Sequence, residues 1–119
     1  MEFDFDWFTR LVKQVYPEEH EGLYNLNETL AIFGYFFSAY ERYMGMQHPP
    51  LRTDQIERII CAMPSIPGES YDDVFCPDPE EYELMIDRYF ETDYGRCDYR
   101  INHFFSGRIR EIKYYETCY

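Results

Sequence analysis

Hydrophobic side chains recur every three or four residues along much of the chain, which is the spacing of a helix that buries one face. In the first such stretch, about residues 4–16, the apolar positions are Trp7, Phe8, Leu11, Val12, Val15 and Tyr16. Asp4 and Asp6 suit the positive end of a helix dipole, and Pro17 ends the helix. We therefore expect a first helix here, followed by a loop.

The most apolar segment of the chain is predicted to form a central helix over about residues 26–47. One stripe comprises Leu26, Leu30, Phe33, Phe37, Tyr40 and Met44, and a second comprises Ile32, Tyr35, Phe36 and Tyr43. A helix that is apolar on nearly all sides is buried on several sides. Asn25 and Glu28 predict a capping box at its start, and Pro49 and Pro50 predict its end.

A third, shorter helix is predicted at about residues 53–63, with Thr53 as its N-terminal cap. Its inner face would consist of Ile56, Ile59, Ile60 and Met63. Proline and glycine then interrupt the helical spacing, so that residues 64–77 are predicted to be irregular. A small pair of strands within residues 64–77 remains an alternative.

The fourth helix has the clearest start signal in the sequence. Asp78 suits the N-cap, Pro79 suits the first helical position, and Glu81 completes a capping box. The apolar positions that follow are Tyr82, Met85, Ile86, Tyr89 and Phe90. This helix is predicted to end near residues 93–95. Residues 99–119 then predict two short helices, or one kinked helix, around a Ser-Gly pair.

Together these elements predict a mainly α fold. A single domain over residues 1–119 would place a compact bundle of five to six helices around the central helix. The chain is 45% hydrophobic and contains 13 Tyr and 10 Phe, so a largely aromatic core is expected and disorder is not. The longest apolar stretch, residues 30–40, is too short to cross a bilayer, and no secretory signal is visible. We therefore expect a cytoplasmic protein.

Charge is distributed unevenly along the chain. The whole sequence carries 23 acidic and 11 basic residues, a net charge of −12. Residues 69–98 hold 11 of the acidic and 2 of the basic residues, whereas residues 99–119 hold 2 acidic and 4 basic residues. A strongly acidic protein repels nucleic acid and anionic membranes and attracts basic surfaces. The alternative is that the charge serves only solubility.

The acidic residues of the fourth helix are predicted to share one face. Glu80, Glu83, Asp87 and Glu91 are spaced by three or four residues, opposite the apolar positions, and like charges at this spacing repel. The residues predicted to bind a partner are Glu69, Tyr71, Asp72, Asp73, Glu80, Glu83, Asp87, Glu91, Asp93 and Tyr94. The alternatives are a solvated face without a partner, and a cation site around Asp72 and Asp73.

Motifs for catalysis or metal binding are missing. His20, His48 and His103 are scattered, and the cysteines, Cys61, Cys76, Cys97 and Cys118, lack the spacing of a zinc site. We expect reduced thiols, no enzymatic activity, and neither a cofactor nor a metal ion. His103 is predicted to be a partly buried structural residue. A Cys–His nucleophilic pair stays open, although no spacing points to one.

The runs Tyr71-Asp72-Asp73 and Glu80-Glu81-Tyr82-Glu83, with Asp87 and Glu91, mix tyrosine with carboxylates over about a quarter of the chain. In composition this segment resembles small acidic inhibitor proteins of phages and mobile elements, among them several anti-CRISPR proteins that mimic DNA. The resemblance implies a protein that occupies a basic, nucleic-acid-binding surface of a partner protein. A homodimer is another use of exposed aromatic residues.

The basic C-terminal segment, residues 99–119, leads to a second hypothesis. Its two predicted helices around a glycine-containing turn are compatible with a helix-turn-helix DNA-binding regulator. The side chains that would face phosphates are Arg100, Arg108, Arg110 and Lys113. The alternative is that these helices only pack their apolar face on the core.

Overall fold

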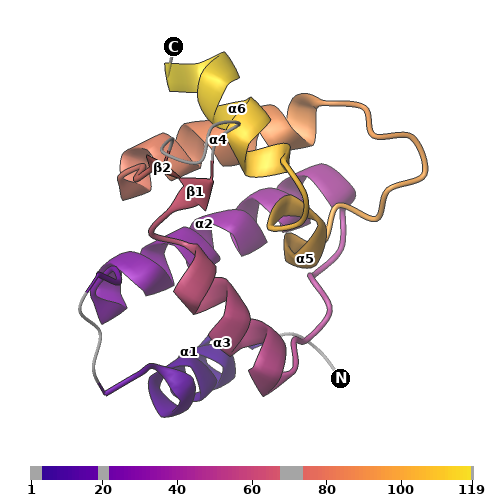
Figure 1. The fold of residues 1–119 in the computed structure, drawn as a ribbon. Coiled ribbons are helices and arrows are strands. Elements are labelled where there is room, and N and C mark those ends of the chain that lie inside the picture. Colours follow the sequence, from indigo (N-terminus) through magenta and orange to yellow (C-terminus); the bar gives the residue numbers. More distant parts are fainter. Residues whose placement is uncertain (1–3, 19–21, 68–73, 119) are drawn as a thin grey trace.

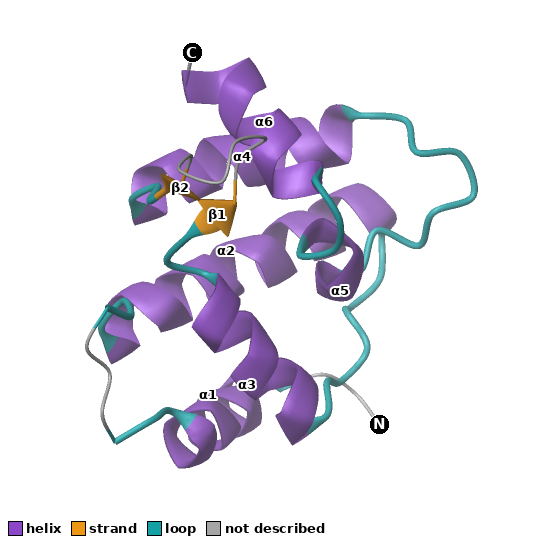
Figure 2. Cartoon of the chain, in the orientation of Figure 1, coloured by secondary structure: helices purple, strands orange, loops and turns teal. Residues whose placement is uncertain are grey.

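The computed structural model of the protein describes residues 4–18, 22–67 and 74–118. Its helices are α1 (Phe5–Val15), α2 (Leu26–Met44), α3 (Thr53–Ala62), α4 (Pro79–Glu91), α5 (Ile101–Phe104) and α6 (Ile109–Cys118). Two short antiparallel strands, β1 (Ile66–Pro67) and β2 (Val74–Phe75), pair between α3 and α4 (Figure 2). The predicted mainly α fold is confirmed, with the small strand pair inside residues 64–77.

Helix α2 runs through the middle of the molecule, as predicted for the central helix. Figure 1 shows α1 and α3 on one side of α2 and α4 with α6 on the other. Helix α2 packs against α4, and α4 in turn packs against α6. Within the described residues, no helix combines the length and the apolar character that a membrane span requires.

The start of α2 is as predicted, but its end is not. Asn25 and Glu28 form the predicted capping box, in which the Glu28 N–H donates to Asn25 Oδ1 at 2.8 Å. The helix ends at Met44, so the prediction that it extends to residue 47 is wrong. Gly45 adopts a left-handed conformation with φ +70°, and its N–H donates to the Glu41 carbonyl. This glycine cap stops the helix before the two prolines are reached.

The predicted cap of α3 is also wrong, whereas that of α4 is confirmed. Thr53 is the first helical residue, and Arg52 occupies the cap position in an extended conformation. The Arg52 N–H donates to Gln55 Oε1 at 3.0 Å, so a side chain from inside the helix satisfies the cap. In α4 the Glu81 N–H donates to Asp78 Oδ1 at 2.8 Å, which completes the predicted capping box.

The core is aromatic and joins all the layers of the fold. Phe36 of α2 is fully buried, and its ring centroid lies 5.1–6.3 Å from five other rings, those of Phe37, His48, Tyr89, Phe90 and Phe104. Phe8 attaches α1 to the same cluster through Phe33 and Phe37, at 4.9 and 5.0 Å. The ring contacts of Phe36 therefore connect α2 with α4, with α5 and with the loop that follows α2.

His48 joins the loop after α2 to the start of α5 from inside the core. Its side chain is 2% exposed. Nε2 accepts a hydrogen bond from the Ile101 N–H at 3.0 Å, so Nδ1 carries the proton and donates to the Pro49 carbonyl at 2.7 Å. Burial lowers the pKa of His48 from 6.5 to about 4. The imidazole is therefore neutral at pH 7, and protonation would remove the acceptor for Ile101.

Acidification is expected to destabilise the protein through His48. Because the folded pKa of about 4 lies below the ordinary 6.5, the contribution is complete above pH 6.5 and is lost as the pH falls toward 4. The loss amounts to about 3 kcal/mol of unfolding free energy. Urea unfolding of the wild type and of His48→Gln at several pH values from 7.5 to 4.5 measures it.

The variant is expected to be less stable at pH 7.5 but to lose less stability on acidification. Titration of carboxylates affects both chains and cancels in the comparison. Parallel stability–pH curves for the two proteins would contradict the role of His48.

Candidate functional site

The acidic face of α4, formed by Glu80, Glu83, Asp87 and Glu91, points away from the core. Helix α4 buries its apolar stripe, which consists of Tyr82, Met85, Ile86, Tyr89 and Phe90. This packing directs the carboxylates outward, so that Glu80, Glu83 and Glu91 are exposed and Asp87 is half-buried. The predicted separation of acidic and apolar positions on this helix is confirmed.

Asp87 differs from the other three because α2 holds it. Its two carboxylate oxygens accept from the Tyr35 hydroxyl at 2.8 and 2.9 Å, and Arg42 Nη2 lies 3.8 Å away. Burial, followed by the hydrogen bond to Asp87, raises the pKa of Tyr35, so its hydroxyl remains a donor. Arg42 thus reduces the repulsion between Asp87 and the neighbouring carboxylates of α4.

A groove between α4 and α6 borders the acidic face. It has a volume of about 440 Å³ and is lined by Leu84, Asp87, Arg88, Glu91, Glu116 and Thr117. Leu84 is 52% exposed, which places an apolar side chain among carboxylates. Glu116 adds a carboxylate from α6 and accepts from Lys113 Nζ at 2.9 Å. Glu116 and Thr117 of α6 supply the second wall of this groove, and Figure 1 shows α6 in front of α4.

Leu84 and Glu116 were not predicted to belong to the surface. Leu84 had a signal in the sequence, since it lies off the apolar stripe and between acidic positions. No signal in the sequence marks Glu116, because only the packing of α6 on α4 brings it into the same groove as Glu91.

The predicted residues that flank α4 have different surroundings. Asp93 is exposed and accepts from the Gly95 N–H at 2.8 Å. The half-buried Tyr94 ring packs against Tyr89 and His103, at 5.3 and 5.2 Å between centroids. The Tyr94 ring is thus held by the fold and is not part of the exposed acidic face. The remaining predicted residues, Glu69, Tyr71, Asp72 and Asp73, lie outside the described part of the chain.

Two of the four basic C-terminal side chains point inward. Arg110 is 9% exposed and donates to the Ala62 carbonyl at 2.8 Å and to the Tyr82 hydroxyl at 3.0 Å. Lys113 is 2% exposed and donates to Thr92 Oγ1 at 2.6 Å. The expectation that Arg110 and Lys113 face phosphates is therefore wrong. Their donors satisfy acceptors on other elements of the fold.

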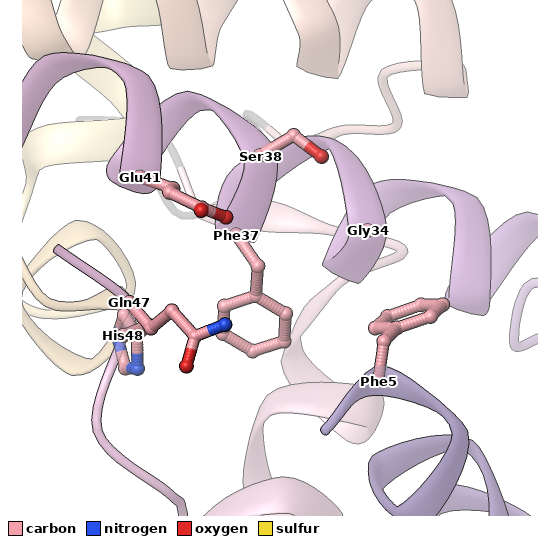
Figure 3. Close-up of a pocket in the computed structure, with 7 residues that line it drawn as sticks. All are labelled: Phe5, Gly34, Phe37, Ser38, Glu41, Gln47 and His48. Atoms are coloured by element: carbon pink, nitrogen blue, oxygen red, sulfur yellow. The ribbon is translucent and has the colours of Figure 1, made fainter. Parts of the chain in front are cut away.

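A separate hollow of about 400 Å³ lies between α1, α2 and the loop after α2. Figure 3 shows the Phe5 and Phe37 rings projecting into it. A Cβ at Gly34 would lie 3.3 Å from the Phe5 ring, so the glycine lets that ring approach α2. Both nitrogen atoms of His48 are bonded to main-chain groups, so His48 contributes only ring surface here.

Within the residues that the structure covers, no group of three or more His, Cys, Asp or Glu side chains is placed to hold a metal ion. Comparisons with protein families, with curated proteins and with solved structures find no match to this chain. The function must therefore be inferred from the chemistry of the surface itself.

Proposed function

We propose that the protein is an acidic inhibitor that binds a partner protein through the acidic face of α4. The bound partner surface would be basic and would normally hold nucleic acid, so that the protein acts as a DNA mimic of the anti-CRISPR kind. The observation that supports this most is the exposure of Glu80, Glu83 and Glu91 along one helix face. A structural role would instead favour pairing each of them with a cation.

The dimensions of this face suit a short stretch of duplex. From residue 80 to residue 91 the helix rises about 16 Å, comparable to about five base pairs of DNA at 3.4 Å each. Charge arranged in this way mainly accelerates encounter and selects among partners. The exposed Leu84 beside the acidic face supplies an apolar contact of the kind that interface centres bury.

The proposal also includes the compartment. Cys61, Cys76 and Cys97 carry free thiols in the described part of the chain, which suits the reducing cytoplasm. In the cytoplasm, an inhibitor encoded by a mobile element would encounter the nucleic-acid-binding proteins that are its proposed targets.

Reversal of the exposed charges is expected to weaken partner binding strongly. The variant carries Glu80→Lys, Glu83→Lys and Glu91→Lys, and it leaves Asp87 in its contact with Tyr35. An exposed ion pair contributes about 0.2–1 kcal/mol, and reversal adds repulsion of similar size. Three reversals should therefore weaken binding about 100-fold. The measurement is an affinity pull-down from the native host with elution at increasing salt, where wild-type complexes should dissociate at moderate salt.

A matched control separates the acidic face from net charge. It carries Glu18→Lys, Glu41→Lys and Glu57→Lys, which make the same charge change at exposed positions elsewhere. This control is expected to retain most of the binding, since charges beyond about 8–10 Å are screened. Equal losses in both variants would refute a localised surface. A shift of duplex DNA by the protein alone at physiological salt would contradict the mimic and favour the helix-turn-helix alternative.

A further inference from the structure

The loop between α4 and α5, residues 92–100, places a cysteine thiol against a histidine ring. The proposed inhibitor function does not use this contact. Figure 2 shows this loop extending beside the helices. Cys97 Sγ lies 3.2 Å from Nδ1 of His103 in α5. The Tyr89 hydroxyl lies 2.7 Å from the same Nδ1 and 3.9 Å from Sγ. A thiol, an imidazole and a phenol thus meet at one point.

The main chain adds a donor directed at the sulfur. The Tyr99 N–H donates to Cys97 Sγ at 3.1 Å. Tyr99 has φ +56° and is the one residue other than glycine with a positive φ in the described part of the chain. Such a conformation is unfavourable for a bulky side chain and needs support from its surroundings. The Tyr99 hydroxyl provides that support, because it donates to the Thr92 carbonyl at 2.7 Å.

Tyr89 determines which groups can carry the proton. Its side chain is fully buried, and burial, followed by the nearby Cys97, raises the pKa of Tyr89. The phenol therefore stays protonated and donates to Nδ1 while His103 is neutral. When the Cys97 proton moves to Nδ1, it takes the place of the Tyr89 O–H at that lone pair, and the new N–H donates to the thiolate. The thiolate then receives two N–H donors, one from His103 and one from Tyr99.

We propose that Cys97 is a redox modification site that reacts with hydroperoxides through a Cys97–His103 pair. A thiol within hydrogen-bond reach of a base is the arrangement of an activated sulfur nucleophile. The thiolate attacks one peroxide oxygen, an S–O bond forms, and the O–O bond breaks. The leaving oxygen takes the proton held by His103 and departs as water or alcohol. Sulfur is oxidised by two electrons to sulfenic acid, and the peroxide is reduced by two electrons.

Accessibility alone predicts the opposite order of reactivity among the cysteines. Cys61 and Cys76 are exposed, whereas Cys97 is half-buried. An ordinary thiol is only a few per cent ionised at pH 7. Because Nδ1 of His103 lies within reach of the Cys97 proton, we expect Cys97 to react about tenfold faster than Cys61 and Cys76. The chain thus contains its own reference thiols.

The test treats the full reduced chain with limiting hydrogen peroxide at pH 7 and traps sulfenic acid with dimedone. Mass spectrometry of the peptides then gives the rate at each cysteine. Cys97 is expected to be labelled about tenfold faster than Cys61 and Cys76. A rate at Cys97 equal to or below theirs would overturn the proposal, and this comparison requires no variant.

A second measurement isolates the role of His103 as a base. In His103→Asn, alkylation of Cys97 by iodoacetamide is expected to slow about tenfold at pH 7. Near pH 9.5, above the ordinary thiol pKa of about 8.5, the two proteins should react at similar rates. A difference that persists at pH 9.5 would indicate altered access and would contradict activation by His103. The rate of alkylation of Cys61, measured in the wild type and in the variant, shows whether the reagent is equally reactive in both samples.

Discussion

Phe36→Ala is expected to lower the free energy of unfolding by about 4 kcal/mol, the largest effect of any substitution considered. Phe36 is fully buried and contacts rings from three further parts of the fold, among them Tyr89 and Phe104. Truncation removes those contacts and leaves a cavity that a ring-filled core closes only in part. The total free energy of unfolding of a small domain is about 5–15 kcal/mol. The substitution would therefore remove a large fraction of the stability.

Urea denaturation followed by circular dichroism measures this loss. Tyr43→Ala is the matched control, because it removes an aromatic side chain of the same helix that is 47% exposed. The control is expected to lose much less stability, since it leaves no cavity. Similar losses for the two variants would show that the core does not depend on Phe36.

Arg110→Met is expected to destabilise the protein by about 3 kcal/mol, although arginine is a residue type that usually lies at the surface. Methionine keeps the aliphatic stem and removes the guanidinium. The change deprives the Ala62 carbonyl and the Tyr82 hydroxyl of a buried donor, and each such loss costs about 1–3 kcal/mol. It also removes the cation from the face of Phe105, 4.7 Å from the ring centroid.

Arg100→Met gives the matched comparison in the same segment. Arg100 is exposed and pairs with Asp98 at 3.3 Å, an arrangement that contributes little to stability. Equal urea midpoints for the two variants would contradict a structural role for Arg110. That outcome would also renew the hypothesis that residues 99–119 contact phosphates.

Local signals in the sequence correctly predicted much of this protein. The capping boxes at Asn25 and Asp78 and the apolar stripe of α4 involve residues no more than four positions apart. Such contacts form within one helix and depend little on the rest of the chain. The acidic face of α4 belongs to the same class, because the burial of one stripe turns the opposite one outward.

Errors arose where two local signals competed or where a contact was long-range. Gly45 ends α2 ahead of the two prolines, which the sequence pattern predicts as its end. Arg110 and Lys113 were predicted to be exposed because they are cations, yet acceptors from α3 and from the end of α4 draw them inward. A buried cation is tolerated only with such partners, and no pattern within residues 99–119 shows that they exist.

The sequence by itself therefore determined the helices, the aromatic core and the row of carboxylates on α4, since each follows from spacing within a few turns of the chain. The tertiary structure decided which carboxylate is held by α2, how α6 completes the groove, and where the basic side chains lie. It also brought Cys97 to His103 and Tyr89. These outcomes depend on how helices dock, and docking is the sum of many small contacts between residues far apart in the chain.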